Sequence, residues 1–117
     1  MPSFLTRLFG RSQPGVDWIE PAELRRRLAG AAPPLVLDVR EPDEFTGPLG
    51  HIEGAVNLPV GNVPARLHEL AADTRPVVTV CLTDKRSAAA AAQLTEAGIG
   101  PVAVLRGGMR AWREAEG

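Results

Sequence analysis

The sequence predicts an α/β fold, in which helices cover both faces of a parallel β-sheet. Two observations lead to this prediction. Short apolar segments rich in β-branched residues alternate along the chain with segments that have helical spacing and helix-ending residues. Three of the apolar segments, Leu35–Val39, Val77–Val80 and Val102–Leu105, are almost without polar residues. Strands that are buried on both faces of a parallel sheet have this composition.

The first half of the chain is expected to supply three strands and two helices. The strands are Val16–Ile19, Leu35–Val39 and Ala55–Leu58, and the helices are Ala22–Leu28 and Glu41–Phe45. Pro21 suits the start of the first helix, and Gly30 followed by Pro33 and Pro34 ends it. Pro42 suits the first turn of the second helix for the same reason.

The second half is expected to supply two more strands and three helices. The strands are Val77–Val80 and Val102–Leu105, and the helices are Val63–Ala72, Ser87–Ala97 and Gly108–Glu116. Leu67 and Leu70 face inward from the first of these helices. A run of alanines favours the second helix and lets it lie close to the sheet, and Gly98 ends it. Right-handed crossovers place the carboxyl ends of all strands at one edge, where a ligand is expected.

Length and composition describe one folded domain of an ordinary globular protein. The chain has 117 residues, of which 44% are hydrophobic, with 13 basic against 14 acidic side chains. This balance gives no reason to expect nucleic acid binding, and no apolar run approaches the length of a membrane span. The single cysteine excludes an intrachain disulfide and leaves too few thiols for a structural zinc site. A free thiol and the lack of an apolar signal segment favour a cytoplasmic location.

Residues 1–15 are expected to be an N-terminal appendage or linker, and residues 16–117 the folded domain. Apolar side chains recur in the appendage at helical spacing, accompanied by basic ones: Phe4, Leu5, Leu8 and Phe9, with Arg7 and Arg11. Such a segment can be an amphipathic helix for a membrane surface or a partner. We favour a short packed helix or a frayed terminus, because two turns bury too little apolar surface to anchor the chain.

The candidate for chemistry is the segment after the Val77–Val80 strand. Cys81 stands where this strand becomes a polar loop, and Ser87, a good N-cap residue, stands where the loop becomes a helix. Backbone N–H groups of the loop, the positive end of the helix, Lys85 and Arg86 all favour a thiolate or a bound anion. The alternative is an inert buried cysteine. We favour a reactive thiol, because a core cysteine needs no polar, basic loop directly after it.

Landmarks from about residue 17 to residue 115 resemble, in the same order, those of single-domain rhodaneses, a family of sulfurtransferases. They are Leu37–Arg40, Glu44–Phe45, Gly50–Ala55, Asn57–Pro59, Cys81–Ser87 (Cys-Leu-Thr-Asp-Lys-Arg-Ser) and Gly107–Trp112. The resemblance implies a rhodanese-like α/β fold with a five-stranded parallel sheet and helices on both faces. It also implies that Cys81 is the catalytic nucleophile, which accepts a sulfane sulfur and holds it as a persulfide.

The resemblance also implies the substrates. The donor is a small sulfur compound, namely thiosulfate, a persulfide or a polysulfide, and the acceptor is cyanide or a thiol, protein thiols included. The residues expected to contact them are Leu82, Thr83, Asp84, Lys85, Arg86 and Ser87. The thiolate attacks the outer sulfur of the donor, and the loop amides stabilise the anionic persulfide. This cycle requires neither a metal nor an organic cofactor.

Two other functions are compatible with the scaffold. Related phosphatases and arsenate reductases resemble a Cys-five-residues-Arg loop, whereas four residues separate Cys81 from Arg86, and Ser87 holds the phosphatase position. A loop that is one residue shorter is expected to hold its amides too close together for a tetrahedral phosphate, so we prefer sulfur transfer. A non-catalytic rhodanese module for regulation or partner binding is the second alternative.

Asp84 departs from the family pattern, because many family loops carry glycine at this position. Aspartate tolerates left-handed backbone conformations better than most residues, so the loop shape is expected to survive. A carboxylate about 7 Å from a thiol opposes ionisation of that thiol by roughly 1 kcal/mol at an effective dielectric constant of about 40. Lys85 and Arg86 offset this effect. Leu82 and Thr83 lack the extra cation of some thiosulfate-using loops, so persulfide or polysulfide donors are considered beside thiosulfate.

Asp38 and Arg40 lie at the end of a predicted strand, on the same edge as Cys81. They are expected either to orient the Cys81 loop or to take part in a structural ion pair, with Glu41 or Glu44 as possible partners. His51 is expected in a turn before a strand rather than as a catalytic base. Other landmarks are interpreted as structural: an exposed His68, core packing by Met109 and Trp112, and a backbone turn at Gly107 and Gly108.

Overall fold

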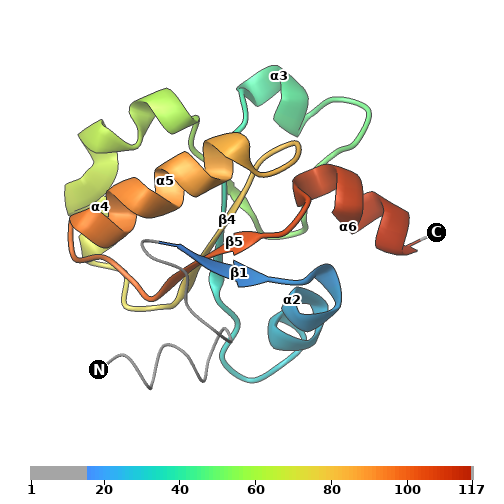
Figure 1. Ribbon diagram of the computed structural model, residues 1–117, viewed down its shortest axis with the longest axis horizontal. Coiled ribbons are helices and arrows are strands. Elements are labelled where there is room, and N and C mark those ends of the chain that lie inside the picture. The colour runs from blue at the N-terminus through green and yellow to red at the C-terminus, as the bar shows by residue number, and fades with distance from the viewer. Residues whose placement is uncertain (1–15, 117) are drawn as a thin grey trace.

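The computed structural model describes residues 16–116, which form an α/β domain around a five-stranded sheet. The strands are β1 (Asp17–Ile19), β2 (Leu35–Asp38), β3 (Val56–Asn57), β4 (Val77–Val80) and β5 (Val102–Leu105). All pairs are parallel, and the order is β1-β5-β4-β2-β3. The predicted parallel sheet is confirmed, and the strand that precedes Cys81, β4, lies at its centre (Figure 1).

Helices cover both faces of the sheet, as the sequence predicts. They are α2 (Pro21–Leu28), α3 (Pro42–Phe45), α4 (Leu67–Ala71), α5 (Lys85–Glu96) and α6 (Gly108–Glu116), with 3₁₀ turns at Val60–Asn62 and Pro64–Arg66. Helices α4 and α5 lie on one face, and α2 and α6 lie on the other (Figure 1). Within residues 16–116, no helix is long and apolar enough to cross a lipid bilayer.

The alternation of side chains along the strands divides the core into two layers. In β4, Val77 packs in the layer covered by α5, whereas Val78 and Val80 pack in the layer covered by α2 and α6. Cys81 follows directly and belongs to the layer under α5. Its side chain is therefore directed at α5, the helix that follows Cys81 in the chain.

Two elements are shorter than predicted by more than one residue. The expected helix Val63–Ala72 begins as a 3₁₀ turn over Pro64–Arg66 and becomes α-helical only over α4. The expected strand Ala55–Leu58 pairs only at Val56 and Asn57. This strand lies at the edge of the sheet, where β2 is its one partner.

Helix α5 begins two residues earlier than the sequence analysis predicts. Asp84, not Ser87, holds the N-cap position, although its side chain makes no capping hydrogen bond. Ser87 is therefore inside the first turn, and this change matters for the thiol. The predicted appendage, residues 1–15, lies outside the described residues.

Candidate active site

Three segments meet around Cys81 at the carboxyl edge of the sheet. Residues 81–86, here called the Cys81 loop, follow β4, while the chain after β2 leads to α3 and the chain after β5 leads to α6. Figure 1 shows α3 and the amino ends of α5 and α6 gathered at this edge. Loops at the carboxyl ends of parallel strands form the ligand site in sheets of this kind.

The Cys81 thiol is buried and contacts Ser87. Its exposed fraction is 1%, and Sγ accepts the backbone N–H of Ser87 at 3.3 Å. The Ser87 hydroxyl oxygen also lies 3.3 Å from Sγ, and the Thr79 hydroxyl donates to the Ser87 carbonyl at 2.9 Å. The first N–H groups of a helix have no partner within the helix, and one of them is directed here at the sulfur. The predicted position of Ser87 as N-cap was wrong, and the actual position brings it into contact with the thiol.

The start of α6 fixes the orientation of the Cys81 loop. The N–H groups of Met109 and Arg110 donate to the carbonyls of Cys81 and Leu82 at 2.8 Å and 3.1 Å. Because the carbonyl and the N–H of a trans peptide point in opposite directions, the N–H groups of Leu82 and Thr83 face away from α6. Among the described residues, no acceptor is bonded to the N–H groups of residues 82–86. The loop therefore offers several free donors beside the thiol.

Gly108 allows α6 to approach the loop this closely. Its φ is +59°, and an added Cβ would lie 2.2 Å from the Thr83 carbonyl oxygen and 2.3 Å from that of Cys81. Gly107 before it also has a positive φ, of 78°. The predicted backbone turn at these glycines is present, and the sequence analysis did not anticipate its contact with the Cys81 loop.

Gly108→Ala is expected to displace the Cys81 loop and to lower the free energy of unfolding by about 1–3 kcal/mol, because strain at positive φ adds to a backbone clash. Gly54→Ala is the matched control, since Gly54 has a φ of +85° but nothing within 4 Å of an added Cβ. Urea unfolding measures stability, and the rate of Cys81 alkylation measures the state of the loop. If both variants behave alike, the close approach of α6 is not what orders the loop.

Arg86 is held by an acidic residue of α3. Its guanidinium donates to both carboxylate oxygens of Glu44, at 2.7 Å and 3.0 Å. These hydrogen bonds lower the pKa of Glu44 to about 2. The same bonds raise the pKa of Arg86, and the nearby charge of Cys81 acts in the same direction. Arg86 thus ties α3 to the start of α5, and Glu44 neutralises much of the charge that the sequence analysis assigned to anion binding.

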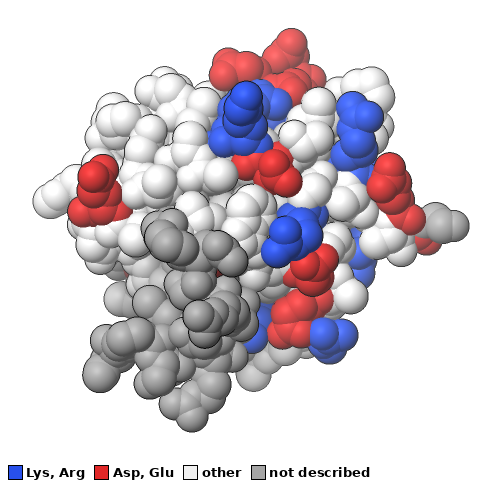
Figure 2. Space-filling model, viewed as in Figure 1, with Lys and Arg blue, Asp and Glu red and all other residues white. Residues whose placement is uncertain are grey.

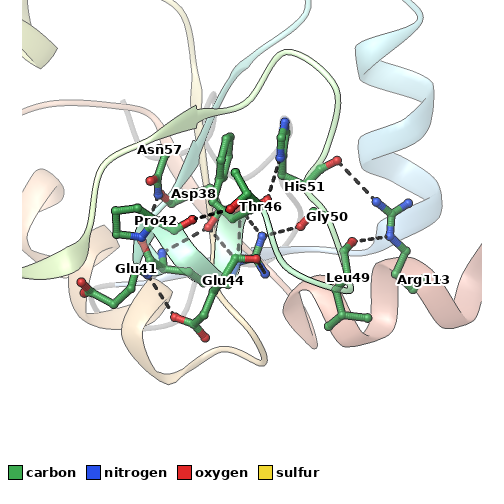
Figure 3. A network of polar contacts seen from close by, with 12 residues as sticks. Asp38, Glu41, Pro42, Glu44, Thr46, Leu49, Gly50, His51, Asn57 and Arg113 are labelled. Carbon is green, nitrogen blue, oxygen red and sulfur yellow. Dashed lines mark hydrogen bonds and ion pairs between the residues drawn. The ribbon is translucent and has the colours of Figure 1, made fainter.

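Asp38 and Arg40 form a buried ion pair with each other. Arg40 Nε donates to Asp38 Oδ1 at 3.0 Å and Nη2 to Oδ2 at 2.8 Å. The same guanidinium donates to the carbonyls of Glu44 at 3.1 Å and Gly50 at 2.7 Å. Figure 3 shows Asp38, Glu44 and Gly50 gathered in one network of polar contacts. No hydrogen bond or ion pair within residues 16–116 joins either side chain directly to the Cys81 loop. Their connection to it runs through Glu44, which binds Arg86.

Asp84 and Lys85 have no ion-pair partner in the part of the chain that the structure describes. Lys85 is exposed and Asp84 is half-buried. The φ of Asp84 is −152°, so the left-handed conformation considered for this position is not used. Aspartate therefore needs no left-handed backbone conformation here, and what it changes relative to glycine is the charge.

His51 stabilises the segment of residues 44–51, here called the wall. Its ring stacks on Phe45 with centroids 3.6 Å apart, and Nδ1 hydrogen-bonds the Phe45 carbonyl at 2.8 Å. Arg113 of α6 donates to the carbonyl of Leu49 at 2.8 Å from the other side (Figure 3). These contacts give His51 a structural role in the chain before β3, where it lies between the turns at 48–49 and 53–54. His68 is exposed, and Met109 and Trp112 are buried.

A cavity of about 520 Å³ lies elsewhere, between α2, α6 and the loop before β3. Arg25, Pro34, Ile52 and Trp112 are among its lining residues, and none of residues 81–87 is. Within residues 16–116, no group of three or more His, Cys, Asp or Glu side chains is arranged to hold a metal ion. The candidate site therefore consists of the thiol, the free amides and the charged residues around them.

Comparison with known proteins agrees with this arrangement. The model of the rhodanese-like domain family matches residues 20–115. A sulfurtransferase from Allochromatium vinosum is 39% identical over 97 residues, which cover 83% of this chain and 88% of that protein. The thiosulfate sulfurtransferase GlpE from Shewanella oneidensis is 39% identical over 80 residues, which cover 68% of this chain and 76% of that protein.

A solved structure gives the same result for the fold. The crystal structure of a rhodanese-related protein from Thermoplasma volcanium has a TM-score of 0.73 and 30% identity, and the match covers 84% of this chain and 91% of that one. Sequence and fold lead to the same family, and the chain belongs to the rhodanese-like domain family.

Proposed function

We propose that this protein is a sulfurtransferase that carries a sulfane sulfur on Cys81. The observation that supports the proposal most is the placement of a lone thiol under the first turn of α5, beside loop N–H groups that have no acceptor among the described residues. Free amides converging on one point stabilise an anion there. The sulfurtransferase names of two relatives agree with this chemistry. We place the protein in the cytoplasm, where a thiol stays reduced.

The proposed cycle has two displacements at sulfur. In the first, the Cys81 thiolate attacks the outer sulfur of thiosulfate, a sulfur–sulfur bond forms to Sγ, and sulfite leaves with the electron pair of the broken bond. With an organic persulfide as donor, the leaving group is the corresponding thiolate. In the second, an acceptor thiolate or cyanide attacks the outer sulfur of the Cys81 persulfide, and the Cys81 thiolate leaves. No electrons are gained or lost overall.

The residues of the loop take separate parts in this cycle. The N–H and hydroxyl of Ser87 lie against Sγ and stabilise it when it is the attacking or leaving thiolate. The amides of Leu82 to Arg86 face the outer sulfur of the persulfide. Arg86 keeps the loop in place through Glu44, while Asp38 and Arg40 support it indirectly by holding the wall that carries Glu44.

One observation favours the alternative of a non-catalytic module. Cys81 is 1% exposed, so a donor has little direct access to its sulfur. A module that recognises a partner needs no such access. The two functions differ in whether Cys81 gains sulfur.

The test is the intact mass of the protein after incubation with thiosulfate and, separately, with glutathione persulfide. A gain of one sulfur atom, located on Cys81 by peptide mapping and removed by cyanide with release of thiocyanate, is the expected result. The appearance of thiocyanate checks the second displacement. If neither donor loads Cys81, the sulfurtransferase proposal fails and the non-catalytic module replaces it.

A further inference from the structure

All but two of the lysines and arginines among residues 16–116 have a carboxylate within ion-pair distance. On the face shown in Figure 2, basic and acidic side chains accordingly lie interspersed rather than in patches of one sign. The exceptions are Lys85 and Arg110. Both side chains are exposed.

Both exceptions belong to helix ends that contact the Cys81 loop. Lys85 is the first residue of α5. Arg110 lies in the first turn of α6, and its N–H donates to the carbonyl of Leu82 at 3.1 Å. Side chains of a helix lean toward its N-terminus, so that of Arg110 leans toward the end of α6 that touches the loop. Lys85 is therefore part of the Cys81 loop itself, and Arg110 lies beside that loop at the start of α6.

The other charges near the thiol give no positive excess. Glu44 occupies the guanidinium of Arg86 through two hydrogen bonds, and Glu41 is a further negative charge that acts on Arg86. Asp84 sets a negative charge against that of Lys85. Arg110 adds a positive charge on the side where the loop meets α6, and its guanidinium has no ion-pair partner among the described residues.

We infer that Lys85 and Arg110 recognise the anionic end of the sulfur donor. This end stays outside the Cys81 loop when the outer sulfur of the donor reaches Cys81. The inference rests on the proposed sulfur transfer and deepens it by assigning donor selectivity to these two residues. The recognised group is an oxyanion: the sulfonate end of thiosulfate or a carboxylate of a peptide persulfide such as glutathione persulfide. An arginine is suited to either, because its planar fork matches two oxygens at once.

The experiment compares Lys85→Gln, Arg110→Gln and the wild type with three donors: thiosulfate, glutathione persulfide and 2-hydroxyethyl persulfide, which has no anionic end beyond the persulfide. The measurement is the second-order rate of sulfur gain on Cys81. Each substitution is expected to slow loading by an oxyanion donor about tenfold, the Coulomb effect of one cation near a dianion in water. Loading by 2-hydroxyethyl persulfide is expected to stay within about twofold, and added salt is expected to slow the wild type more than either variant.

Arg106→Gln is the matched control, because Arg106 is exposed, close in sequence to Arg110 and paired with Glu20. It is expected to leave all three rates unchanged, and Arg110→Lys is expected to recover part of the loss. Loss with thiosulfate alone identifies the sulfonate, and loss with glutathione persulfide alone identifies the carboxylate. If the wild type loads but the rates of the two variants are unchanged, or fall equally with all three donors, the inference is wrong while sulfur transfer stands. If the wild type loads with no donor, both are wrong.

Discussion

Replacing Cys81 with serine is expected to reduce sulfur transfer to the uncatalysed rate with thiosulfate and with persulfide donors alike. A hydroxyl is a far weaker nucleophile toward sulfane sulfur than a thiolate, and no stable persulfide forms on oxygen. The fold is expected to survive, because the serine oxygen can accept the Ser87 N–H that Sγ now accepts at 3.3 Å. Thiocyanate formation and intact mass measure the loss, and thermal unfolding checks the fold.

Ser87→Ala is the companion variant, which measures how much the hydroxyl beside the nucleophile contributes to the rate. It keeps Cys81 and the backbone N–H but removes the hydroxyl 3.3 Å from Sγ. One hydrogen bond to a charged group contributes about 1.5–3 kcal/mol, so the rate is expected to fall by about 10- to 150-fold rather than to background. Cys81→Ser that retained wild-type function in its native host would favour the non-catalytic module. If the wild type released phosphate from an aryl phosphate and Cys81→Ser did not, a phosphatase would be favoured.

The sequence was sufficient to predict the features that depend on local pattern. Strand composition predicted the parallel sheet, and the position of Cys81 directly after β4 placed the thiol at the carboxyl edge. A structural ion pair at Asp38 and Arg40 was one of two expected outcomes, with Glu41 or Glu44 as possible partners, and the structure pairs the two residues with each other. In each case a short stretch of chain carries the whole signal.

The features that the sequence analysis missed join segments far apart in the chain. Glu44 and Arg86 are 42 positions apart, and their pairing depends on how the chain after β2 places α3 beside α5. The contact of Gly108 with the Cys81 loop depends on β5 lying next to β4. The glycine pair Gly107–Gly108 and the carboxylate of Glu44 could be recognised in the sequence as unusual positions. Their contact partners, however, became known only from the three-dimensional arrangement.

The Asp38–Arg40 pair gives the largest expected effect on stability. The exposed fractions of the two side chains are 1% and 2%. Arg40→Met removes the guanidinium, leaves the Asp38 carboxylate buried without its partner, and removes the donors to the carbonyls of Glu44 and Gly50. Breaking one partner of a buried pair costs about 3–5 kcal/mol, a large part of the roughly 5–15 kcal/mol that stabilises a typical domain.

A second substitution, at Asp38, decides whether the unpaired charge is the cause of this loss. Asp38→Asn combined with Arg40→Met removes the buried charge, so the double variant is expected to be more stable than Arg40→Met alone, by about 1–3 kcal/mol in urea unfolding. Sulfur transfer is not expected to recover with stability, because Arg40 also holds the segment that carries Glu44, and Glu44 holds Arg86 of the Cys81 loop. Equal stability of the single and double variants would place the loss in the carbonyl contacts instead. Full recovery of transfer would show that the loop does not depend on this wall.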